Sequence, residues 1–244
     1  MFIDIEELSA AIVTKPAPVL FLDTCTILDV IRAPYRESIA VEEINAAKNL
    51  IQLSEQSLPG VWLVTNETVH GEWLANVDTV KLELERETKK IERQRSKFLA
   101  AVDIVYGMKH EIGHRVEHLK LSEHLENLSK KILSTSQIIK IADCHSLNGM
   151  HRVRKYLAPA GRGKQEAKDC EIFEAFLDTG RSLRSKGFLG AICFVTANSD
   201  DYGKPTEPKS PLDTELLDIN AHYVGSLSWA KAVVEKERHP ITSK

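Results

Sequence analysis

Short apolar runs alternate with amphipathic segments along most of the chain. Five runs are mainly apolar, as expected for strands buried in a parallel sheet: 19–22, 61–64, 138–141, 191–195 and 221–224. Between them, apolar residues recur every three or four positions, which indicates helices. Strands alternating with helices favour right-handed crossovers. We therefore expect a three-layer α/β/α fold around a central parallel sheet of four to five strands.

One long segment interrupts this alternation. Residues 72–106 contain no glycine or proline, and their apolar positions follow a spacing of three and four residues, which predicts a long helix close to coiled-coil periodicity. After Gly107, a second helical pattern covers 121–132. We expect residues 75–135 to form an antiparallel helical hairpin projecting from the body. Its charged faces are interpreted as solvated, and an arm that docks a partner is the less favoured reading.

Composition narrows the class of protein. The chain has 244 residues, 43% of them hydrophobic and 27% charged, with a net charge of −3, so any attraction to nucleic acid must come from a local patch. No apolar run approaches the roughly 20 residues that span a bilayer. The amino terminus does not resemble a signal peptide, and the four cysteines form no CxxC pair. We expect a cytoplasmic protein with free thiols and no membrane association.

Acidic residues follow several of the predicted strands. Asp23 ends the first strand, Glu72 lies in the first turns after the second, Asp169 begins a helix, and Asp200 and Asp201 follow the strand at 191–195. In a parallel sheet these positions gather at the carboxyl edge, where α/β proteins bind ligands. Clustered carboxylates repel unless protons or cations neutralise them, and hard oxygen ligands suit Mg²⁺ or Mn²⁺. The simpler alternative for Asp23 alone is a helix cap.

A basic segment precedes Asp169. It contains a single acid, Glu166, and six cations: Arg152, Arg154, Lys155, Arg162, Lys164 and Lys168. Residues 158–163 within it predict a loop. Arginine and lysine beside a metal site are typical of phosphate binding, so we expect Arg162, Lys164 and Lys168 to bind substrate. The alternative is a solvated loop.

Four sequence motifs together resemble the PIN-domain ribonuclease family, which includes toxin ribonucleases of bacterial toxin–antitoxin pairs. They are Val19-Leu-Phe-Leu-Asp-Thr-Cys-Thr-Ile-Leu, His70-Gly-Glu-Trp, Lys168-Asp-Cys-Glu-Ile and Phe194-Val-Thr-Ala-Asn-Ser-Asp-Asp-Tyr. The resemblance covers residues 18–72 and 165–230. It implies a single PIN-like domain over 1–244 with the hairpin as an insertion. It also implies a divalent-metal-dependent endoribonuclease.

The resemblance also implies roles for individual residues. Asp23, Glu72 and Asp169 take the family's acidic, metal-binding and catalytic positions, while Thr24 and Thr196 hold the site through their hydroxyl groups. The family usually has Thr-x-Asp after the fourth strand, but this chain has Asn198 there, so Asp201 or Asp200 is a candidate for the fourth charge. The implied partners are Mg²⁺ or Mn²⁺, RNA (with single-stranded DNA as a second candidate), a cognate antitoxin or other protein, and a second copy of the chain.

Three other functions compete with this one. A haloacid-dehalogenase-like phosphatase would need a second Asp two residues after Asp23, where Cys25 stands. A catalytically weak or inactive PIN-like module that binds nucleic acid or protein is the stronger rival, because Asn198 weakens the acidic set. A structural protein that oligomerises through its hairpin is the third.

Overall fold

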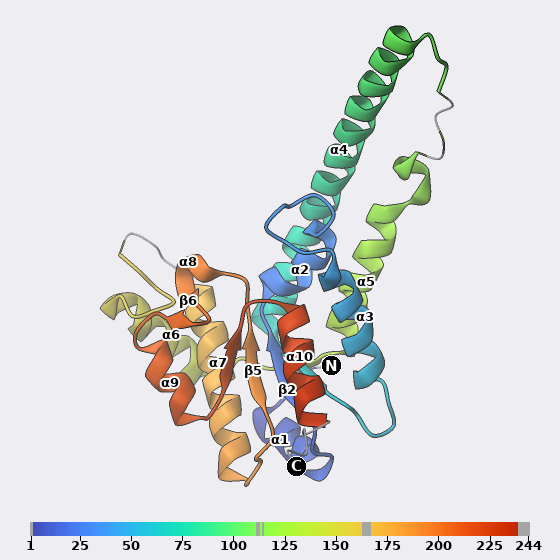
Figure 1. Cartoon of the computed structure of the whole chain (residues 1–244). Coiled ribbons are helices and arrows are strands. Elements are labelled where there is room, and N and C mark those ends of the chain that lie inside the picture. The colour runs from blue at the N-terminus through green and yellow to red at the C-terminus, as the bar shows by residue number, and fades with distance from the viewer. Residues whose placement is uncertain (1, 111–112, 114, 163–166, 239–244) are drawn as a thin grey trace, which may run out of the picture.

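A six-stranded parallel sheet forms the centre of the computed structural model, which describes residues 2–110, 113, 115–162 and 167–238 (Figure 1). The strands, in their order across the sheet, are β1 (Phe2–Ile3), β4 (Gln137–Ile139), β3 (Trp62–Asn66), β2 (Val19–Leu22), β5 (Ile192–Val195) and β8 (His222–Val224). All five neighbouring pairs are parallel. The expected parallel α/β sheet is confirmed, and each of the five apolar runs overlaps one of its strands.

The sixth strand corrects the expected number of four to five. β1 is only two residues long and pairs with β4, Phe2 lying opposite Ile138. Two residues are too few to show any periodicity in the sequence. The strand is therefore defined by its partner on the sheet and not by its own pattern.

Helices cover both faces of the sheet. They are α1 (Ile5–Thr14), α2 (Thr24–Arg32), α3 (Glu42–Ser54), α6 (Asp143–Lys155), α7 (Ala167–Ser185), α8 (Ser199–Tyr202), α9 (Leu212–Asp218) and α10 (Leu227–Arg238). α1 and α6 pack on α7, whereas α3 packs on α10 and α2. A short antiparallel pair, β6 (Gly203–Lys204) and β7 (Glu207–Pro208), follows α8.

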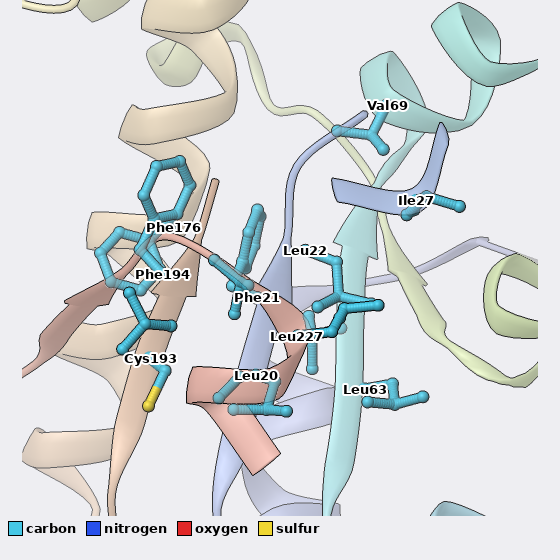
Figure 2. Packing of buried hydrophobic residues seen from close by; sticks show 14 of the residues in the cluster. Leu20, Phe21, Leu22, Ile27, Leu63, Val69, Phe176, Cys193, Phe194 and Leu227 are labelled. Atoms are coloured by element: carbon cyan, nitrogen blue, oxygen red, sulfur yellow. The ribbon is translucent and has the colours of Figure 1, made fainter. Parts of the chain in front are cut away.

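Side chains of β2 alternate between these two helical layers. Phe21 contacts Phe176 of α7, with ring centroids 5.6 Å apart. Leu20 and Leu22 point to the opposite face, where Leu227 of α10 lies (Figure 2). All four residues of β2 are buried, because successive side chains of a strand face opposite sides and both sides are covered.

The predicted hairpin consists of α4 (Glu67–Tyr106) and α5 (Leu121–Thr135), with a 3₁₀ turn, η1 (Val116–Leu119), before α5. α4 projects well beyond the body (Figure 1). It begins at Glu67, before the expected start of the hairpin at residue 75. The Asn66 side chain accepts a hydrogen bond from Val69 N (2.9 Å) and caps the helix there. It ends where Gly107 adopts a left-handed conformation, φ 63°. The first turns of α4 therefore belong to the body.

None of the described helices combines the length and the apolarity needed to cross a bilayer. The four cysteines are free thiols, as expected. Burial raises the pKa of Cys170 to about 11 and that of Cys193 to about 12, so both remain uncharged at neutral pH.

Candidate active site

Asp23 lies at the carboxyl end of β2, and its side chain is only 3% exposed. Three donors hold its carboxylate. Thr24 N donates to Oδ1 (2.7 Å), while Thr196 Oγ1 (2.7 Å) and Cys25 Sγ (3.2 Å) donate to Oδ2. The bond from Thr24 N also caps α2, so the helix-cap interpretation and the site interpretation both describe this residue.

Burial is the main cause of a raised pKa at Asp23. The three hydrogen bonds to Asp23 oppose this effect, and the negative charge of Glu72 adds to it. A buried carboxylate beside a second acid gains free energy when a cation neutralises it. The electrostatics of Asp23 therefore favour a bound cation at this edge of the sheet.

Glu72 reaches this edge from the second turn of α4. Thr24 Oγ1 donates to Glu72 Oε2 (2.7 Å), which joins Glu72 to the segment that carries Asp23. Lys168 Nζ of α7 lies 3.5 Å from Glu72 Oε1. The early start of α4 is what places this carboxylate beside β2 rather than out on the hairpin.

Asp169 lies in the first turn of α7, and its backbone oxygen accepts a hydrogen bond from the Tyr202 hydroxyl (3.1 Å). Burial raises the pKa of Tyr202 well above its usual range, and the charges of Asp23 and Asp169 raise it further. The charges of Asp23 and Asp169 therefore both reach the hydroxyl group of the same buried side chain. The structure thus brings Asp23, Glu72 and Asp169, from three separate segments, to one edge of the sheet.

Asn198 and Asp201 form a small structure of their own after β5. Asn198 Oδ1 accepts from Asp201 N (3.3 Å) and Nδ2 donates to Asp201 Oδ2 (2.8 Å), so Asn198 caps α8 and orients Asp201. Asp201 is buried, whereas Asp200 is exposed. Of the three candidates for the fourth position, Asp201 is the buried carboxylate, and the amide oxygen of Asn198 is already used within the chain.

The candidate ligands are the four carboxylates. The soft group beside them is the Cys25 thiol, which stays protonated because burial raises its pKa. Such a set of oxygen donors suits Mg²⁺ or Mn²⁺. Within the described residues, the carboxylate oxygens of Asp23, Glu72, Asp169 and Asp201 do not form a group of three lying within 4.8 Å of one another. Because Mg²⁺ usually keeps several waters, this wider spacing fits an ion that some of the carboxylates reach through water.

A comparison with protein families shows which family the chain belongs to. The family model described as PIN domain matches residues 20–202, which include all four acidic positions. The chain belongs to the PIN domain family. PIN domains are generally nucleases, and they typically use divalent metals. No curated protein and no solved structure matches the chain.

The described basic residues of the segment 152–168 in this PIN domain fall into an exposed group and a buried one. Lys168 pairs with Glu72, and the Arg162 guanidinium carbon lies 5.9 Å from the centre of the Tyr156 ring. Lys164 falls outside the described residues. Arg152 corrects the expectation of a basic loop, because it lies on α6, is 3% exposed and pairs with acids of α7 and α9. Arg152 is therefore excluded from the phosphate-binding residues.

A second cluster, Cys144, His145 and Asp178, has ligand atoms within 4.8 Å of one another. The hydrogen bonds argue against metal binding there. His145 Nδ1 accepts from Ala142 N (3.1 Å), which leaves the proton on Nε2, directed at Asp178 Oδ2 (3.0 Å). A metal would need the lone pair of Nε2. Asp178 also lies about 14 Å along α7 from Asp169. This cluster is separate from the PIN carboxylates.

Sequence reasoning missed one residue that joins the elements of the PIN site. Glu171 accepts hydrogen bonds from Thr68 Oγ1 of α4 (2.6 Å) and from Ser146 Oγ of α6 (2.5 Å). With the Lys168–Glu72 contact, the bond from Thr68 fixes the first turns of α4 and α7 side by side in antiparallel directions. No local pattern could have revealed it, because the three residues are far apart in the sequence.

Proposed function

We propose that this PIN domain is an endoribonuclease that hydrolyses RNA phosphodiester bonds with Mg²⁺ or Mn²⁺. The observation that carries the proposal is the environment of Asp23. This carboxylate is buried, has a raised pKa, and shares one sheet edge with Glu72 and Asp169. Such a set of charges is unfavourable in a structural core and favourable around a divalent cation.

Asp23, Glu72, Asp169 and Asp201 are the residues that would hold the ion, and Asn198 would orient Asp201. When bound, the ion supplies an activated water and stabilises the leaving oxygen of the phosphodiester. The chain's own hydroxyl groups orient the ligands: Thr196 holds Asp23, and Thr24 holds Glu72. Arg162 and Lys168, with Lys164 outside the described residues, would bind the phosphates flanking the cleaved bond.

An inactive PIN module that binds nucleic acid or a protein is the second candidate, and Asn198 is the observation that favours it. One assay separates the two. Labelled RNA and DNA of the same sequence are incubated with Mg²⁺, with Mn²⁺ or with a chelator, using the parent protein and Asp169→Asn. We expect cleavage of RNA that needs the ion and is lost in Asp169→Asn. Binding of RNA without cleavage at any ion concentration would select the inactive module.

The partners stay proposals alongside the activity. Single-stranded DNA is the second candidate substrate, and the DNA arm of the same assay tests it. A cognate antitoxin or other protein partner, a homo-oligomer and a cytoplasmic location follow from the family resemblance and from composition. They are independent of the cleavage chemistry.

Replacing Lys168 with Met should change metal binding and RNA binding in opposite directions. The ammonium group lies 3.5 Å from Glu72, so its removal leaves more negative charge for a cation, and Mn²⁺ should bind more tightly. RNA should bind more weakly, and the slope of log K against log salt should fall by about 0.7, the value for one lost phosphate contact on a single strand. Titration calorimetry with Mn²⁺ and anisotropy with labelled RNA measure both. Lys48→Met, an exposed lysine of α3, is the matched control. Loss of Mn²⁺ affinity in Lys168→Met would contradict the assignment.

Glu171→Ala should weaken Mn²⁺ binding by roughly 10- to 100-fold, the usual cost of removing a group that orients metal ligands. The variant loses the two hydrogen bonds that Glu171 makes, one to α4 and one to α6, so Asp169 and Glu72 are held less firmly relative to each other. Direct Mn²⁺ binding, followed by electron paramagnetic resonance, is the measurement. Glu171→Gln, which can still bond to both hydroxyl groups, should recover most of the affinity. Equal Mn²⁺ affinity in parent and Glu171→Ala would show that Glu171 does not position the site.

A further inference from the structure

The outer part of α4 carries a stripe of exposed apolar side chains that the active site does not use. Phe98 is 74%, Val105 73% and Tyr106 71% exposed, and Ile91 and Val102 are also exposed. Their spacing of three, four or seven residues places them on one side of the helix. We call these five residues the tip face. An exposed apolar stripe of this size usually marks a binding surface.

The tip face continues a surface that is buried nearer the body. Val77 and Leu84 occupy the same positions of the three-and-four spacing and are buried in the core, as are Leu125 and Ile132 of α5. The bond from Val116 N to Glu92 Oε1 (2.9 Å) marks how far η1 accompanies α4. Beyond that level, α4 extends past α5 (Figure 1). A further helix placed on the tip face would continue the packing that α5 begins.

One border of the tip face is basic: Lys90 and Lys97 lie along it, with Lys90 paired to Glu87 (3.2 Å). The other border carries Glu92 and Asp103, which are used within the hairpin. Glu92 accepts from Val116 N and lies 3.9 Å from Arg95, and Asp103 pairs with His110. Lys90 and Lys97 lie seven residues apart beside the stripe, and Arg95 lies within it. A partner helix would therefore meet an apolar centre with a basic border.

We propose that the tip face is a docking surface for an amphipathic helix of another protein, with an apolar stripe and acidic flanks. The three-and-four spacing selects a helix, because knobs at these positions pack into the holes of a second helix. The basic border selects acidic flanks, because like charges across an interface cost free energy. The same argument disfavours a second copy of the chain, which would bring two basic borders together. This proposal goes beyond the nuclease activity and does not depend on it.

Two designed helical peptides test the proposal on the full-length protein. Both have leucine and isoleucine at the stripe positions. One has glutamate at the flanking positions, and the other has lysine. We expect the glutamate peptide to bind at least about tenfold more tightly than the lysine peptide in fluorescence anisotropy, and to weaken as salt is raised. Absence of binding by the glutamate peptide, or equal binding of the two peptides, would overturn the proposal.

Variants locate the binding site. Phe98→Glu and Val105→Glu should each remove binding of the glutamate peptide, because they place a charge in the apolar centre. Leu189→Glu alters an apolar residue of the body that is even more exposed, so it should leave binding unchanged. These positions are on the surface, so all three variants should keep the parent melting temperature. If the glutamate peptide still binds to Phe98→Glu and Val105→Glu, its binding site lies elsewhere and the proposal is wrong. If the mass measured by sedimentation rises with protein concentration, and Phe98→Glu and Val105→Glu abolish this rise, the tip face binds a second copy of the chain instead.

Discussion

Asp23→Asn is expected to lower the rate of RNA cleavage by at least about 10²-fold, the usual minimum loss when one group that stabilises the transition-state charge is removed. Asn has almost the same shape as Asp but carries no charge, so the loss measures the charge at the end of β2. Single-turnover cleavage of labelled RNA in Mn²⁺ is the measurement. Asp218→Asn, an exposed acid of α9 with the same change in charge, is the matched control. If Asp23→Asn cleaved RNA as fast as Asp218→Asn does, Asp23 would not be part of the active site.

The same substitution should not destabilise the metal-free protein. Burial raises the pKa of Asp23 above its ordinary value of 3.8, so the folded state holds the proton more tightly than the unfolded state. Stability therefore falls as pH rises from about 3.8 through the raised pKa. Asn removes this loss, and the Thr196 hydroxyl can accept a bond from its amide. We expect a melting temperature at pH 7 equal to or above that of the parent without metal.

Divalent ions should change the melting temperatures of the parent and of Asp23→Asn by different amounts. Mn²⁺ should raise the melting temperature of the parent, because a ligand that binds only the folded state stabilises it, and should raise that of Asp23→Asn much less. A clear drop in the melting temperature of metal-free Asp23→Asn would indicate that its hydrogen bonds matter more than its charge. It would argue against a strained cluster of carboxylates at this edge.

The sheet and the positions of the acids could be predicted because both depend on local patterns. An apolar run such as 19–22 signals a buried strand, and the parallel order places the residue after it at the carboxyl edge. Asp23 was found by this rule. Glu72 was found in the first turns after the second strand, and Asp169 at the start of a helix, within the motif Lys168-Asp-Cys-Glu-Ile. β1 escaped because two residues show no period. The expected hairpin began at residue 75 whereas α4 begins at Glu67, because a continuous helical pattern does not show where the helix leaves the body.

The remaining features depend on contacts that no local pattern records. Asn198 looked like a substitute for an acid, but it is the cap that orients Asp201. Glu171 looked like any other acid of an amphipathic helix, although it joins three helices. In both cases the residue type is ordinary and the partner is what gives it a role. The partner is set by the packing of helices across the site, which the sequence specifies only through the whole fold.

Arg152 is the clearest example, and its replacement should have the largest effect on stability. Its guanidinium group donates to Glu174 Oε1 (2.5 Å), to Glu215 Oε1 (2.6 Å) and to the carbonyl oxygen of Ala158 (2.7 Å), so it joins α6, α7, α9 and the loop before α7. Arg152→Met should cost about 3–5 kcal/mol, because it leaves the buried Glu174 and the half-buried Glu215 without their cation. Urea unfolding followed by circular dichroism measures this loss.

Two further variants separate the lost cation from lost packing in this experiment. Arg154→Met, an exposed arginine two residues along α6, should change the free energy of unfolding by less than about 0.5 kcal/mol. Adding Glu174→Leu and Glu215→Leu to Arg152→Met should recover much of the stability, because apolar residues can replace a buried ion cluster at little cost. If Arg152→Met were no less stable than Arg154→Met, Arg152 would be available to the substrate after all. The basic segment would then have to be treated as one phosphate-binding surface, because its division into two groups rests on the burial of this one guanidinium group.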